Sequence, residues 1–235
     1  MFKKILIFII TGTLIFIISG CEGNGEESGE IPKEGTYVRC VEVNERETYD
    51  IANGSIVWVG EDLLFEESDL IFKGKVLDDA TEIAIEYYID GKLYYVYYED
   101  IFTFEVEKIY YSESSSLGAG DIIRVSNSSC PSYWITGTIR MEKGKSYIVL
   151  TGKVTDYPDI EFTKYSDYFT KDPWVSIVLV EDGKYYVDEE LPSLTNNAEE
   201  EIIRKDGDFK TTLYVKGSGF EDELEALILE KKGES

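Results

Sequence analysis

The sequence contains no histidine, which excludes several familiar kinds of catalytic and metal site. Without imidazole a protein lacks Ser-His and Cys-His activation of a nucleophile, His ligands for zinc and a His-based pH switch. Basic residues are also scarce, with 23 Lys and Arg against 47 Asp and Glu and a net charge of −24. Because phosphate backbones are bound by clusters of Lys and Arg, this balance argues against a nucleic-acid partner.

The residues that are abundant favour a folded chain. Of 235 residues, 43% are hydrophobic and 14% aromatic, including 18 Tyr and 11 Phe. A disordered chain of this charge would be poor in aromatic residues. The length is that of one domain or slightly more.

The N-terminus has the pattern of an exported bacterial lipoprotein. Lys3 and Lys4 precede fourteen mostly apolar residues, 5–18, which are too few to span a bilayer and indicate a cleaved signal peptide. The following Ser19-Gly20-Cys21 resembles a lipobox, which implies that Cys21 is acylated and becomes the first residue of the mature chain. The alternative is an ordinary signal peptide in which the cysteine is coincidental.

Residues 21–35 follow as a flexible acidic tether, because they are rich in glycine and glutamate and nearly free of large apolar side chains. A tether of this length spans about 20 Å root-mean-square. We therefore expect an extracytoplasmic protein anchored to the bacterial cell membrane by lipid on Cys21. Its acidity predicts repulsion from anionic headgroups, so that the folded part stands off from the membrane.

Two cysteines remain for the folded part, Cys40 and Cys130. In an exported protein an even pair suggests a disulfide, which would contribute about 4 to 5 kcal/mol in the chain-entropy model. The alternative is two small buried thiols.

Strand and turn signals dominate the middle of the chain. Residues 70–77 alternate as a strand in which Gly74 is a candidate bulge. Residues 82–99 predict a hairpin about Asp90-Gly91, with Tyr87 opposite Tyr94 and Ile85 opposite Val96. Further strands are expected at 101–111, 121–126 and 146–150, with a second Asp-Gly hairpin over 175–187.

Helix signals are fewer and lie at the edges of this β-rich region. They cover 61–68, 197–205 and 220–232, the last with acids in its first turn and lysines in its last. The predicted fold is mainly β, a small antiparallel OB-like barrel with a short helix before the first long strand and a C-terminal helix. We expect residues 36–235 to form a single domain, with the barrel at about 61–190 and a helical segment at about 195–232.

Four strand segments carry a resemblance to a known family. They are Asp69–Val76, Phe102–Tyr110, Gly120–Val125 and Met141–Leu150, and they resemble the strands of bacterial cell-surface lipoproteins. That pattern is similar to the netrin-module, or tissue-inhibitor-of-metalloprotease-like, OB-fold over about residues 61–190. In those inhibitors a free N-terminal cysteine chelates the zinc of the target, whereas Cys21 is expected to carry lipid.

The most distinctive candidate binding feature is the tyrosine-rich hairpin. Because strand neighbours point to opposite faces, its tyrosines line both sides and at least two of them should be exposed. Exposed tyrosines suit protein or glycan ligands, whereas the alternative is cross-strand pairing that only stabilises the hairpin. The candidate contacts are Tyr87, Tyr94, Tyr95, Tyr97 and Tyr98.

These features favour a binding or interaction module and not an enzyme. No catalytic residues, metal ligands or cofactor site are predicted, and acidic clusters such as 221–223 are interpreted as solvated surface. A protease inhibitor is the alternative function, and a hydrolase that uses carboxylates alone is a weaker one.

Overall fold

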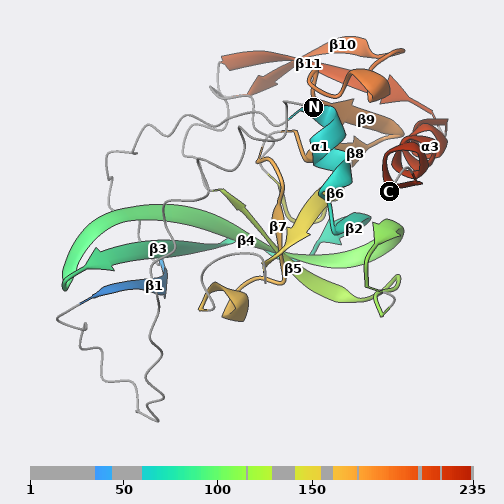
Figure 1. Ribbon diagram of the computed structural model, residues 1–235. Coiled ribbons are helices and arrows are strands. Elements are labelled where there is room, and N and C mark those ends of the chain that lie inside the picture. Colours follow the sequence, from blue (N-terminus) through green and yellow to red (C-terminus); the bar gives the residue numbers. More distant parts are fainter. Residues whose placement is uncertain are drawn as a thin grey trace, which may run out of the picture. The chain divides into compact units, whose positions relative to one another are not determined.

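Five strands close into a barrel in the computed structural model (Figure 1). The strand β2 pairs with β4 and β6, β4 pairs with β5, and β7 closes the ring between β5 and β6. All these pairs are antiparallel except β5 with β7, which is parallel. The small OB-like barrel predicted from the sequence is therefore present. The bounds are β2 Leu70–Val76, β4 Lys92–Ser112, β5 Ile122–Ser128, β6 Ser146–Lys153 and β7 Tyr168–Thr170.

The structure describes only part of the chain. The described residues all belong to one compact unit, Lys33–Ser235. They are residues 35–43, 60–114, 116–128, 141–154, 161–173, 175–205, 208–217 and 219–233.

Alternating apolar residues fill the barrel. Phe72 and Phe104 meet edge to face at 5.3 Å between ring centroids in its interior. Gly74 lies at a shift of the β2–β4 register, as the sequence predicted, and a Cβ there would lie 3.0 Å from the carbonyl oxygen of Glu105. The strand therefore curls where a side chain would not fit. The buried interior includes Leu70, Phe72, Val76, Phe102, Phe104, Val106, Ile123, Val125, Tyr147 and Val149.

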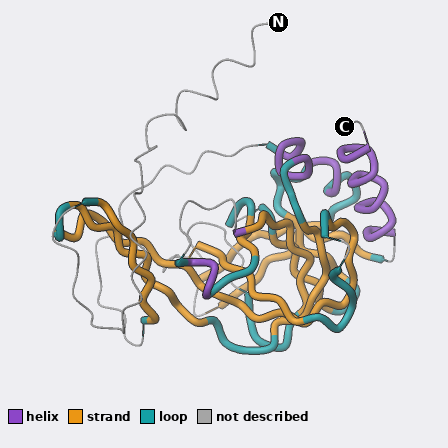
Figure 2. The backbone as a smooth tube through the Cα atoms, turned by 60° about the horizontal axis from the view of Figure 1, so that its bottom comes forward, coloured by secondary structure: helices purple, strands orange, loops and turns teal. Residues whose placement is uncertain are grey.

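A second set of strands extends the sheet from β6. The order is β6-β8-β9-β11-β10, and the bounds are β8 Ile177–Glu181, β9 Lys184–Val187, β10 Glu199–Lys205 and β11 Asp208–Lys216. The helices α1 (Glu61–Glu66) and α3 (Gly219–Gly233) pack on these strands and on the outside of β2 and β6 (Figure 2). Two short 3-10 turns, η3 (Phe162–Lys164) and η4 (Pro192–Leu194), complete the fold.

Three strands reach beyond the barrel on one side, and we call them the arm (Figures 1 and 2). The arm consists of β1 (Thr36–Glu42), β3 (Thr81–Ile89) and the first half of β4, which pairs with β3 through residues 92–101. Its hairpin turns at Asp90-Gly91 with φ of +49° and +72°, the conformation that favours Asp-Gly. The second predicted hairpin has the same turn at Asp182-Gly183.

Several sequence-based expectations were wrong. The strands expected to end at 99 and begin at 101 are one continuous strand, β4, which leaves the arm and enters the barrel. In the hairpin Tyr87 lies opposite Tyr95 and Ile85 opposite Tyr97, because a bulge between Tyr87 and Tyr88 shifts the predicted register by one residue. The helix expected at 197–205 is instead the strand β10.

Candidate functional site

Three tyrosines form a stacked row on one face of the arm, and we call Tyr87, Tyr95 and Tyr97 the tyrosine row. The rings of Tyr87 and Tyr95 lie 4.3 Å apart and nearly parallel. The ring of Tyr97 lies 5.9 Å from that of Tyr87 and 6.2 Å from that of Tyr95. Burial, with the neighbouring Tyr87 adding to it, raises the pKa of Tyr95, so its hydroxyl stays neutral and can donate a hydrogen bond.

The other candidate tyrosines are placed differently. Tyr94 lies at the bulge with 71% of its surface exposed and its ring edge-on to Tyr95. Tyr98 lies opposite Ala84 on the face away from the row, and it is half-buried. On that second face the buried Tyr88 stacks on Tyr37 of β1 at 4.7 Å. The five candidates therefore do not form one surface, and the row contains three of them.

The root of the arm packs against the connection between β6 and β7. Ile83 and Ile85 of β3 share an apolar cluster with Val154 and Phe162 from this connection. The hydroxyl of Tyr165 donates a hydrogen bond of 3.3 Å to the carbonyl oxygen of Cys40. In a five-stranded OB barrel the first hairpin and the connection between the fourth and fifth strands flank the usual ligand face. The arm occupies the first of these positions, and Val154 with residues 161–167 forms the described part of the second.

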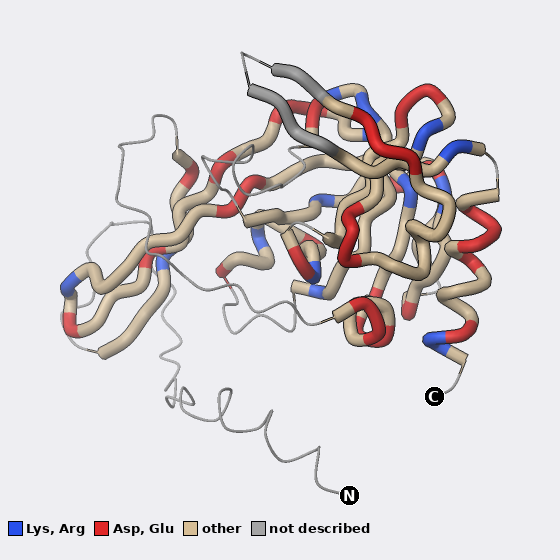
Figure 3. The backbone as a smooth tube through the Cα atoms, turned by 90° about the horizontal axis from the view of Figure 1, so that it is seen from above, with Lys and Arg blue, Asp and Glu red and all other residues tan. Residues whose placement is uncertain are grey.

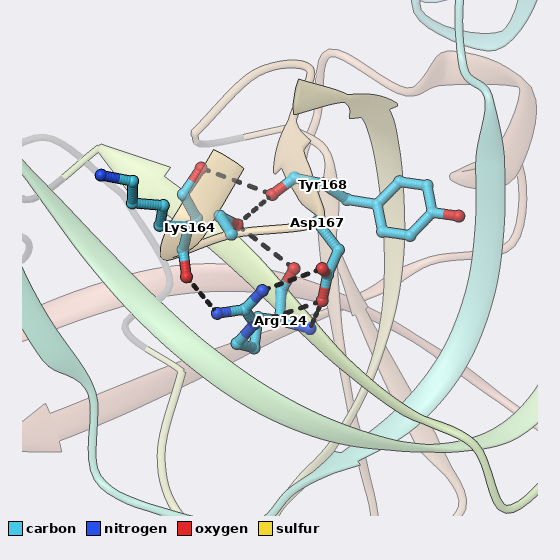
Figure 4. A network of polar contacts seen from close by, with 6 residues as sticks. Arg124, Lys164, Asp167 and Tyr168 are labelled. Carbon is cyan, nitrogen blue, oxygen red and sulfur yellow. Dashed lines mark hydrogen bonds and ion pairs between the residues drawn. The ribbon is translucent and has the colours of Figure 1, made fainter. Parts of the chain in front are cut away.

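An arginine fastens the end of this connection to the barrel (Figure 4). The guanidinium of Arg124 on β5 binds both carboxylate oxygens of Asp167, at 3.0 Å and 3.3 Å, and also donates to the carbonyl oxygen of Lys164. The backbone N–H of Arg124 donates to the same carboxylate at 2.9 Å. Because the Asp167 carboxylate neutralises the guanidinium of Arg124 through both of its oxygens, we assign Arg124 the role of holding this connection in place.

A shallow hollow of about 440 Å³ lies beside this network. Most of its lining residues are polar, among them Glu113, Lys153, Thr163 and Asp167. The ammonium of Lys153 lies 3.3 Å from the carboxylate of Glu113, so the cation at the hollow is also paired. The hollow therefore offers hydrogen-bonding groups, but its charged side chains are already paired with one another or with Arg124.

A buried polar cluster lies where the arm meets the barrel, and its only sign in the sequence is two acids in a β-prone run. Glu99 and Asp100 are 5% and 6% exposed. Burial raises the pKa of Glu99 to about 8 against the lowering effect of the Ser128 hydroxyl, which donates a hydrogen bond of 3.2 Å, and the charge of Asp100 adds to the rise. Asn127, opposite Asp100, accepts a hydrogen bond of 2.7 Å from the Thr170 hydroxyl.

The remaining predicted site residues fall as follows. Cys40 is buried in β1, whereas Cys21 and Cys130 lie outside the described residues, so the lipid attachment and the disulfide stay predictions. Within the described ranges, no three Asp, Glu or Cys side chains converge as metal ligands would. No helix in the part of the chain described here is long and apolar enough to cross a membrane.

The sequence matches no protein-family model, and no curated protein matches it significantly.

Proposed function

We propose that this protein is a lipid-anchored extracytoplasmic binding module that recognises a protein or glycan at the bacterial cell envelope through the tyrosine row. The N-terminal pattern ending at Cys21 supports export and anchoring. The resemblance to netrin-like domains of cell-surface lipoproteins is consistent with this display. The single observation that carries the proposal is the row itself, which stands on the hairpin that flanks the ligand face in OB barrels.

The stacking of the row favours a protein over a glycan as the ligand. A sugar ring packs on an open aromatic face, but Tyr87 and Tyr95 cover each other's faces at 4.3 Å. Stacked rings instead present their edges and hydroxyl groups, and Tyr95 remains 41% exposed. Tyrosine side chains of this kind are enriched in protein interfaces because they add contact area at a small entropic cost.

The proposal is tested by removing two of the three tyrosines of the row. The double variant Tyr95→Ser, Tyr97→Ser of the mature chain is compared with the unchanged protein on peptide and glycan arrays and against purified envelope proteins. We expect the double variant to lose at least about tenfold in affinity for any ligand found, as hot-spot aromatics do.

The matched control is Tyr98→Ser, which removes one tyrosine from the opposite face of the same strand. Full binding by the double variant, with the same ligand retained by Tyr98→Ser, would rule out the row as the site. Acylation is tested separately by labelling with radioactive fatty acid, which Cys21→Ser should abolish.

A further inference from the structure

The tip of the arm carries an exposed apolar patch. We call Ile89, Leu93, Tyr94 and Tyr95 the tip patch; their exposed fractions are 43%, 50%, 71% and 41%. Among the described residues seven large hydrophobic side chains are exposed, and these four lie within seven positions of one another. The register pairs Ile89 with Lys92 and Leu93 with Tyr88, so the patch covers both faces of the tip. Single exposed apolar residues are ordinary, but several at the end of one projecting hairpin indicate a contact surface.

The bulge and the local charge both suit such a contact. Tyr88 lies opposite Leu93 and Tyr87 opposite Tyr95, so Tyr94 is the extra residue of the bulge and turns outward. The turn carries one acid and one base, Asp90 and Lys92, so the tip is close to neutral although the whole chain has a net charge of −24 (Figure 3). The repulsion expected between this chain and anionic lipid therefore does not arise at the tip.

The tether enters the fold at this same tip. Thr36, the first residue of β1, pairs with Ile89, and the backbone of Gly35 exchanges hydrogen bonds with Asp90 at 2.8 Å and 3.0 Å. Residues 22–34 thus connect the predicted lipid on Cys21 directly to the tip. The composition of these 13 residues predicts a tether that would keep the tip within about 20 Å of the membrane on average, at a high effective concentration.

We infer that Ile89, Leu93 and Tyr94 of the tip patch insert into the bilayer interface, while Tyr95 remains with the tyrosine row. The inference rests on the proposed anchorage through Cys21 and adds a second, weak contact to it. Tyrosine has an apolar ring and a polar hydroxyl, so it is stable at the level of the headgroups. A protein partner would also suit an apolar tip, but the position of the tether favours the membrane. In this arrangement the tip of the fold contacts the membrane. This differs from the expectation, based on the acidity of the chain, that the folded part stands off from the membrane.

The inference is tested by the depth of the tip in a bilayer. Acylated full-length protein is reconstituted into phosphatidylcholine vesicles with and without brominated acyl chains, which quench tryptophan on contact. The probe is Tyr94→Trp, and the control is Leu229→Trp on α3, where the native side chain is 73% exposed. The unsubstituted protein gives the background from the three native tryptophans.

We expect brominated lipid to quench the added Tyr94→Trp fluorescence about twofold or more and to leave the added Leu229→Trp fluorescence unchanged. Acrylamide, which quenches from the water phase, should quench the added Leu229→Trp fluorescence more strongly than the added Tyr94→Trp fluorescence. Equal behaviour of the two probes would overturn the inference and leave the tip in water, where a protein partner could reach it.

A second measurement separates the tip from the anchor. The unacylated mature chain with Cys21→Ser should bind neutral vesicles weakly, and adding Leu93→Ser should weaken this binding about tenfold, since an apolar side chain is lost from the contact. Failure of the acylated protein to attach to vesicles at all would refute the anchorage, whereas attachment without quenching of Tyr94→Trp would refute only the tip contact.

Discussion

Replacing Glu221 by Gln should weaken the attachment of α3 to the barrel. The carboxylate of Glu221 accepts hydrogen bonds from the ammonium groups of Lys73 and Lys108, both at 2.9 Å, and from the hydroxyl of Tyr185 at 3.0 Å. It therefore does not belong to a solvated acidic surface, as the sequence had suggested for residues 221–223. Partial burial by itself would raise the pKa of Glu221, but the hydrogen bonds from Lys108 and Lys73 outweigh it and lower the pKa to about 2.

The magnitude follows from this lowered pKa. The difference from the ordinary value of 4.5 corresponds to about 3 kcal/mol of folding free energy. Because the side chain of Lys108 is 41% exposed, solvent screening reduces the expected effect of Glu221→Gln to about 2 kcal/mol at pH 7. Since the folded-state pKa is depressed, the contribution is complete above about pH 5 and is lost as the pH falls through 4.5 toward 2.

Urea unfolding followed by tryptophan fluorescence measures this difference at pH 7 and at pH 3. The unacylated mature chain serves as the parent, and Glu225→Gln is the control one turn further along α3. Glu225 contacts Lys108 at 2.9 Å but is 46% exposed, so its replacement should cost less than about 1 kcal/mol. A Glu221→Gln protein as stable as its parent at pH 7, or one whose deficit is the same at pH 3, would refute the reasoning.

Two further predictions concern buried groups. Glu99→Gln should stabilise the protein by about 2 to 4 kcal/mol at pH 9 and change its stability little at pH 4.5. The reason is that the pKa of Glu99 is raised to about 8, so ionising this buried carboxyl costs stability as the pH rises from 4.5 through 8. Unfolding curves at both pH values check this, and a variant no more stable than its parent at pH 9 would contradict it. Gly74→Ala should destabilise the barrel by about 1 to 3 kcal/mol, since the new Cβ would lie 2.8 Å from the Phe72 ring and 3.0 Å from a backbone oxygen of Glu105. The midpoint of thermal unfolding measures this loss of stability. An unchanged midpoint would show that the curled strand tolerates a methyl group.

The sequence by itself determined the features that depend on residues close together in the chain. Both Asp-Gly turns were predicted because few other pairs tolerate two successive positive φ values. The curl at Gly74 and the C-terminal helix were predicted for similar reasons, and Leu224, Leu227 and Ile228 of α3 are buried on one face as their spacing indicated. The order of the strand and helix signals along the chain was sufficient to indicate a small barrel.

The tertiary structure alone decided features that depend on partners distant in the chain. The acidic segment at β10 has the composition of a helix, yet it pairs with β11, where Glu199 binds Lys216 and the hydroxyl of Tyr214. A strand partner with these groups outweighs a weak local helix preference. The bulge beside Tyr94 is likewise a property of strand pairing, because the register of β3 on β4 places Tyr95 opposite Tyr87 and leaves Tyr94 without a partner in the ladder.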